Sequence, residues 1–106
     1  MAKYMIQASY TADGLKGLMK DKASGRKAAV TKAVETAGGK LEAMYYSFGK
    51  ADVVLIADMP DNASAAAFAL AASASGLVRA TTTPLLTIEE ADRALTKKMA
   101  YRGPGK

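Results

Sequence analysis

The sequence contains no cysteine and no histidine. Without cysteine there is no disulfide and no thiolate chemistry, and this composition agrees with a reducing compartment. Without histidine the chain lacks the commonest general base and the commonest ligand of metals and haem. HExxH, CxxC, Walker and GxSxG motifs are also missing. We therefore expect no metal and no cofactor, and any chemistry would depend on Asp, Glu, Lys, Tyr, Ser or Arg.

Long hydrophobic runs are also missing. The N-terminus enters a strand-like pattern directly, with no apolar segment of signal-peptide length, and no window approaches the length of a membrane span. The 106 residues, half of them apolar, suit one domain with one core. We expect a cytoplasmic protein that does not bind membranes, with a single domain over residues 1–106 and an irregular tail over residues 103–106.

The net charge of +5 is concentrated in one segment. Residues 14–40 hold seven Lys or Arg against two acids. Basic surfaces that bind single-stranded nucleic acid interleave aromatic side chains for stacking on bases, and this segment has none. We interpret it as a solvated helix face and expect no nucleic-acid partner.

Hydrophobic periodicity predicts an order of strand, helix, strand, strand, helix, strand and a final helix. The expected strands are 3–10, 41–48, 53–57 and 77–83, and the expected helices are 15–21 continued by 24–37, 63–74 and 88–99. This order is the split βαβ pattern of a ferredoxin-like α+β sandwich, with two helices on one face of a four-stranded antiparallel sheet.

Local signals set several element ends. Ser24–Gly25 interrupts the first helical pattern, and Gly38–Gly39 ends it. Pro84 cannot donate to a ladder, so the fourth strand should lie at an edge. Thr87 and Glu90 form a capping-box pattern before the last helix. Eight of the twelve residues from 63 to 74 are alanine, so that helix can approach the sheet closely.

The second face of the sheet is not expected to be polar. In the strands 41–48 and 53–57, both alternating sets of side chains contain Met, aromatic or branched residues. A soluble monomer rarely exposes such a patch. We therefore predict a homodimer, or a higher homo-oligomer, formed through this open sheet face. The alternative is that residues 88–99 fold back over the open face of their own sheet.

At this level of detail the sequence resembles the small bacterial GYD domain proteins. The segments that carry the resemblance are 4–10, 24–27, 38–41, 45–49, 52–54, 60–63 and 82–87. The resemblance implies a ferredoxin-like domain of the dimeric α+β barrel type and implies no activity, since the family is of unknown function. The family name refers to a Gly, Tyr, Asp signature. In this chain Gly49 and Asp52 are present, but Ala51 precedes the aspartate.

Barrels of this type often enclose a cavity between the sheet and its helices, so inward-facing polar groups are the candidates for a site. They are Tyr10, Arg26, Tyr45, Tyr46 and Arg79. A guanidinium with one or two phenols can bind a carboxylate or phosphate, so we expect a small anionic or aromatic ligand. The alternative interpretation is that the tyrosines are packing residues and the arginines are surface or interface groups.

A second functional hypothesis is a cofactor-independent enzyme of the dimeric barrel class, similar to a monooxygenase or isomerase. Without histidine, its base would be a tyrosine, Asp58 or a desolvated lysine. No residue pattern in the sequence identifies a catalytic set.

Overall fold

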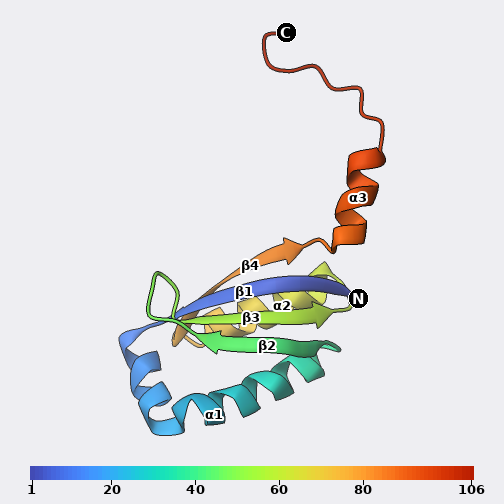
Figure 1. Cartoon of the computed structure of the whole chain (residues 1–106). Coiled ribbons are helices and arrows are strands. Elements are labelled where there is room, and N and C mark those ends of the chain that lie inside the picture. Colours follow the sequence, from blue (N-terminus) through green and yellow to red (C-terminus); the bar gives the residue numbers. More distant parts are fainter.

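The computed structural model describes all 106 residues and has the predicted α+β, ferredoxin-like architecture (Figure 1). Its elements are β1 (Ala2–Tyr10), α1 (Ala12–Thr36), β2 (Lys40–Tyr46), β3 (Val53–Met59), α2 (Asn62–Ala74), β4 (Val78–Leu85) and α3 (Ile88–Thr96). The four strands form one antiparallel sheet in the order β2-β3-β1-β4. The fold-class prediction is confirmed.

The sheet has β1 and β3 at its centre and β2 and β4 at its edges. Pro84 pairs with Tyr4 inside β4, and the edge position predicted from this proline is confirmed. The second strand ends at Tyr46, earlier than predicted, because residues 47–52 form the turn to β3 and leave Phe48 fully exposed. An irregularity between Leu41 and Ala43 shifts the register of β2 against β3.

Helices α1 and α2 lie on one face of the sheet, and the core lies beneath them. Tyr4, Ile6, Leu55, Ala57 and Met59 point to this face and are buried. Val34 of α1 and Ala65 of α2 complete the buried set from above. Each large apolar side chain that is fully buried contributes about 1.5–3 kcal/mol, and the buried apolar residues of the molecule belong to this layer.

The interruption of α1 occurs earlier than the sequence indicated. The non-helical residue is Lys22, with φ 67° and ψ 168°, whereas Ser24 and Gly25 lie within the helix. The prediction of a break at Ser24–Gly25 was therefore wrong by two residues. The first piece of α1 leaves the end of β1, and the second runs along the sheet (Figure 1). The chain must change direction where the second piece of α1 begins to pack on the sheet. This packing, rather than a local sequence signal, puts the break at Lys22.

Other boundary signals are confirmed. Gly38 follows α1 with φ 85°, the left-handed conformation that glycine adopts without a steric penalty. The side chains of Thr87 and Glu90 form the predicted capping box at the start of α3. Asp61 caps α2 by accepting a hydrogen bond from the backbone N–H of Ser64.

Helix α3 and the segment after it extend away from the sheet and give the molecule principal extents of 55 × 32 × 22 Å (Figure 1). The helix does not fold back over the open face of its own sheet. None of the helices combines the length and the apolar character that crossing a bilayer requires.

Candidate functional site

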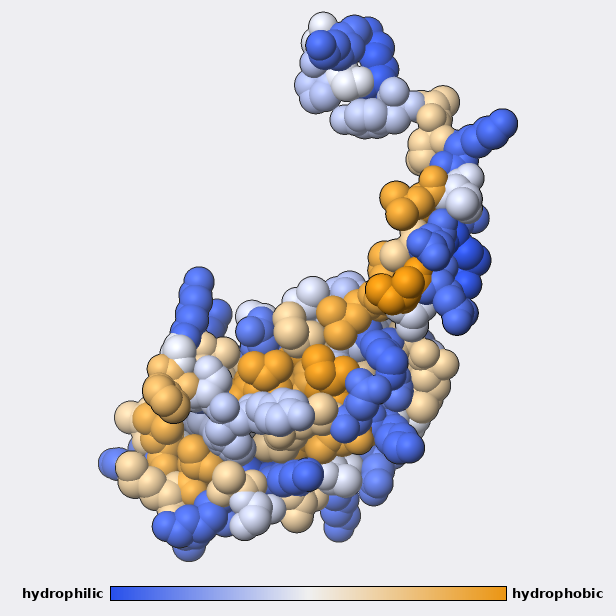
Figure 2. Space-filling view, viewed as in Figure 1, coloured by the Kyte–Doolittle hydropathy of each residue, from blue (hydrophilic) through white to orange (hydrophobic).

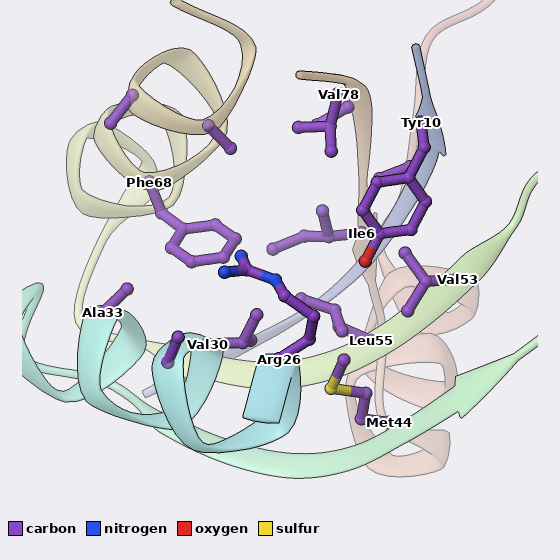
Figure 3. Close-up of a pocket in the computed structure, with 15 residues that line it drawn as sticks. Ile6, Tyr10, Arg26, Val30, Ala33, Met44, Val53, Leu55, Phe68 and Val78 are labelled. Atoms are coloured by element: carbon purple, nitrogen blue, oxygen red, sulfur yellow. The ribbon is translucent and has the colours of Figure 1, made fainter. Parts of the chain in front are cut away.

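A cavity of about 270 Å³ lies between the sheet and the two helices that cover it (Figure 3). It exists because small side chains surround it. Six of the fifteen lining residues are alanines. The sheet contributes Ala8 and Ala80, α1 contributes Ala29 and Ala33, and α2 contributes Ala71 and Ala72. Ala29, Ala33 and Ala71 are exposed, so the cavity opens to solvent between the helices.

The rest of the lining is almost entirely apolar. Ile6, Val53, Leu55 and Val78 form the floor on the sheet, and Phe68 of α2 forms part of a wall. Fourteen of the fifteen lining residues are hydrophobic. A surface of this composition binds the apolar part of a ligand and leaves its orientation to the few polar groups present.

Arg26 is the one charged residue in the lining. Its side chain reaches from the second piece of α1 into the cavity, in the space between Phe68 and Tyr10 (Figure 3). The one carboxylate within 4.0 Å belongs to Asp21, whose Oδ2 is 3.9 Å from Nη1 of Arg26. That separation is too long for a hydrogen bond, so the guanidinium donors remain available to a ligand.

Tyr10 and Tyr46 form a pair beside the cavity. Their rings are stacked, with centroids 6.5 Å apart and an angle of 4° between the planes, and their hydroxyl oxygens are 3.0 Å apart. Burial raises the pKa of Tyr46 well above its usual range, and the hydrogen bond with Tyr10 adds to this effect. The charge of Arg26 opposes the rise only weakly. The fold therefore favours the neutral form of the Tyr46 phenol.

The structure brings together three of the five candidate residues, Tyr10, Arg26 and Tyr46, and places the other two on the opposite face. Tyr45 lies on the open face of the sheet with 71% of its surface exposed. Arg79 borders a separate hollow of about 380 Å³. The alternation of side chains along β2 and β4 accounts for this separation, because neighbouring residues in a strand point to opposite faces.

Asp58, a base considered from the sequence, also lies away from the cavity. Its carboxylate accepts a hydrogen bond from Lys3 at 2.9 Å, and Glu42 accepts another from the same ammonium group at 2.9 Å. These contacts raise the pKa of Lys3, with the bond to Glu42 as the largest cause. No group of three or more His, Cys, Asp or Glu side chains is placed to hold a metal ion.

Sequence reasoning missed the residues that shape the cavity. The alanine-rich stretch of α2 indicated close packing on the sheet, yet Ala71 and Ala72 border open space. A usable signal was present in α1, where Ala29 and Ala33 lie one turn apart on the same helix face as Arg26. Small residues next to a charged one on one face of a helix indicate room for a bound group.

Taken together, the cavity offers an apolar surface, one guanidinium and one accessible phenol, that of Tyr10. A guanidinium donates two parallel hydrogen bonds to a carboxylate, and a phenol adds a third donor. The arrangement suits a small molecule with an anionic group at one end and an apolar or aromatic body at the other.

Comparison with known proteins gives one match. The model of a protein family described as GYD domain matches residues 4–95. Neither a curated protein nor a solved structure matches the chain.

Proposed function

The chain belongs to the GYD domain family, and we propose that it is a homo-oligomeric domain that binds a small aromatic or other apolar anion in the cavity between α1, α2 and the sheet. One observation carries the proposal: the guanidinium of Arg26 enters an otherwise apolar cavity and has no carboxylate within hydrogen-bond distance. A partly desolvated cation whose nearest carboxylate is 3.9 Å away, too far for a hydrogen bond, favours binding of an anion from solution.

The size of the cavity limits the ligand. At about 270 Å³ it lies just below the range of about 300–1,000 Å³ that is typical of pockets for drug-sized molecules. A single aromatic ring bearing a carboxylate has the right proportions. The ring would lie against Ile6, Leu55 and Phe68, and the carboxylate would accept hydrogen bonds from Arg26 and Tyr10.

The geometry favours binding over the alternative of a cofactor-independent enzyme. General base catalysis needs a proton acceptor within hydrogen-bond reach of the substrate. The cavity lining includes no carboxylate and no lysine, Tyr46 is held in its neutral form, and Asp58 lies on the other face of the sheet. This lining supports binding and orientation of a ligand, and the phenol of Tyr10 is its one group that can exchange a proton.

The oligomeric part of the proposal is supported by the open face. Met5, Val54 and Ile56 form an apolar centre on this face, next to Tyr45 of β2. Along β4 the outward residues are Arg79, Thr81, Thr83 and Leu85, so the face is less apolar along the first part of β4 than β2 and β3 alone indicated. An apolar centre with a polar border is the usual anatomy of a protein interface, and two such faces can pack in an isologous dimer.

The ligand hypothesis is tested by thermal shift with benzoate and phenylacetate as probes and with benzyl alcohol as a neutral control. A probe at 100 times its Kd stabilises the folded state by about 2.7 kcal/mol. We expect the two anions to raise the Tm and the neutral alcohol to have little effect. Arg26→Gln should abolish the shift, because it removes the charge and the bidentate donor.

Arg79→Gln is the matched control, since it removes the same charge from the opposite face of the sheet. It should leave the ligand-induced shift unchanged. The proposal is wrong if no anion shifts the Tm, or if Arg26→Gln and Arg79→Gln behave alike.

A further inference from the structure

We propose that the C-terminal arm, defined as residues 86–106, docks on the open sheet face of a second copy of the chain, and that the two copies exchange arms. This inference rests on the homo-oligomeric part of the proposed function and is independent of the ligand cavity. The second copy is the occupant because one chain carries both halves of the contact.

The first half is the arm itself. Leu86, Ile88, Leu95, Met99 and Tyr101 are between 65% and 83% exposed. Ile88 and Leu95 lie seven residues apart on one face of α3, and Figure 2 shows an apolar stripe along the arm beside strongly hydrophilic residues. Isolated helices as short as the nine residues of α3 are marginal in water. This helix has a complete capping box but no packed surface, so it needs a partner.

The arm does not reach its own sheet. Only Leu86 and Thr87 separate the end of β4 from α3, and the helix continues away from the sheet edge (Figure 1). The apolar stripe therefore faces solvent in a single chain (Figure 2).

The second half is a hollow at one end of the open face. Its volume is about 380 Å³, and its lining consists of Gln7, Ser9, Lys50, Ala51, Arg79 and Thr81. Lys50 and Arg79 form no ion pair within the chain. The hollow adjoins the apolar centre, because Gln7 lies opposite Val54 in the sheet. It offers two unpaired cations beside an apolar surface.

Helix α3 matches this hollow in charge, since its three acids outnumber Arg93, whereas the rest of the arm is basic. Asp92 lies four residues after Ile88 and three before Leu95, so it borders the apolar stripe, and Glu89 lies one turn before it. Both carboxylates are free of ion pairs within the chain. Docking would place the acidic groups next to Lys50 and Arg79, and the stripe against the end of the face that the sheet of the other copy leaves uncovered.

Symmetry brings the two halves together. When two sheets pack face to face about a two-fold axis that runs across the strands, the end of β4 in one copy lies over the start of β4 in the other. The arm leaves from the end of β4, and Arg79 lies at its start. Each arm thus departs beside the hollow of the other copy.

An anionic membrane is the other occupant to consider, since Lys97, Lys98, Arg102 and Lys106 follow α3. The three acids of α3 itself, Glu89, Glu90 and Asp92, would be repelled by such a surface. The charge pattern of the helix therefore favours the basic hollow.

The test uses full-length chains with charge reversals. Light scattering after size exclusion should show a dimer for the unmodified chain and weaker dimers for Asp92→Arg and for Arg79→Glu. Mixing these two variants should restore the dimer, because each arm then meets an opposite charge on the other copy. If the arm contacted the hollow of its own chain instead, mixing the two variants would not restore the dimer. The control mixture pairs Asp92→Arg with Arg102→Glu, whose altered charge lies outside the hollow. It should recover less, because every mixed dimer keeps one like-charge contact between the reversed arm and Arg79.

Because the chain contains no cysteine, a second measurement uses introduced thiols. Under oxidation, Arg79→Cys mixed with Asp92→Cys should give a covalent dimer. A chain that carries both cysteines should also cross-link to another chain.

A third measurement removes the apolar stripe. A chain with both Ile88→Asp and Leu95→Asp should dimerise about tenfold or more weakly, because apolar burial is lost, while the thermal unfolding of its monomer stays unchanged.

Each contrary outcome has a distinct meaning. A monomer at micromolar concentration overturns the exchange and the homo-oligomer but leaves the ligand cavity intact. A dimer that none of these substitutions affects overturns the arm exchange alone. Binding to anionic vesicles that Leu95→Asp removes, with no cross-linked dimer, assigns the arm to a membrane surface and overturns the proposal.

Discussion

Gly14 and Gly17 lie one turn apart in α1 but have different surroundings. A Cβ atom at Gly14 would lie 1.9 Å from the carbonyl oxygen of Leu77, whereas one at Gly17 would meet no atom within 4 Å. The close approach at Gly14 accompanies the hydrogen bond from the backbone N–H of Thr11 to the same Leu77 oxygen, which joins the start of α1 to the start of β4.

We expect opposite effects from the same substitution at these two positions. Gly14→Ala forces the backbone apart and should lower the free energy of unfolding by about 1–3 kcal/mol. Gly17→Ala should raise it by about 0.5–1 kcal/mol, because alanine has less conformational freedom to lose in a helix. Urea denaturation measures both. Equal effects would mean that Gly14 is not in contact with Leu77.

Tyr46 predicts how stability depends on alkaline pH. Its pKa is raised in the folded state, chiefly by burial, so the fold favours the neutral phenol. The resulting stabilisation is complete below the unfolded value near 10 and is lost as the pH rises from there toward the folded value. In Tm measurements from pH 8 to 11, Tyr46→Phe should show a smaller decline than the unmodified chain.

Tyr45→Phe serves as the control, since Tyr45 is the residue next to Tyr46 and its phenol is exposed on the other face of the sheet. It should leave the alkaline decline unchanged. If both variants have the same profile as the unmodified chain, the phenol of Tyr46 is not desolvated.

At the scale of elements, α1 contains the largest departure from regular geometry. Lys22 adopts φ 67° and ψ 168°, a region that only glycine occupies without a steric penalty. Asp21 precedes the break and Arg26 follows it, so the break sets the position from which Arg26 enters the cavity.

Lys22→Gly should relieve this conformation and raise the free energy of unfolding by about 1 kcal/mol. The control is Lys20→Gly, at an exposed position with ordinary helical geometry, which should lower it by about 1 kcal/mol. Chemical denaturation of the two variants checks the sign. Destabilisation by both would show that the helix is continuous through Lys22.

On the scale of the whole molecule, the cavity results from the way two helices rest on the sheet. Phe68 and Val30 pack against the core clusters and set the spacing, while alanines leave the volume between them. The cavity therefore owes its volume to these alanines and holds the guanidinium of Arg26.

Ala72→Leu should fill part of this volume. Because the added carbons occupy existing space, we expect the free energy of unfolding to change by no more than about 1 kcal/mol. Binding of benzoate should be lost in the thermal-shift assay. The control, Ala74→Leu, lies at the exposed end of α2 outside the lining and should keep the ligand response. Unchanged binding in Ala72→Leu would place the ligand elsewhere.

Much of this protein follows from local sequence. The order of elements and the fold class could be predicted because the signals for them act over a few residues each. These signals are the alternation along β1 and β3, the glycines after α1, the capping box at Thr87 and Glu90, and Pro84. Tyr10, Arg26 and Tyr46 could be nominated as inward-facing polar groups, but the same reasoning also named Tyr45 and Arg79, which lie on the other face.

Tertiary structure alone decided the rest. Three features depend on how distant elements pack, and no short sequence pattern encodes that packing. They are the break at Lys22, the separation of Arg26 from Arg79 by the thickness of the sheet, and the cavity between alanines. The direction of α3 is of the same kind, since its apolar stripe specifies that the helix must be covered but not by which surface. Local propensities act through neighbours in the chain, whereas sites and interfaces arise from contacts between residues far apart in it.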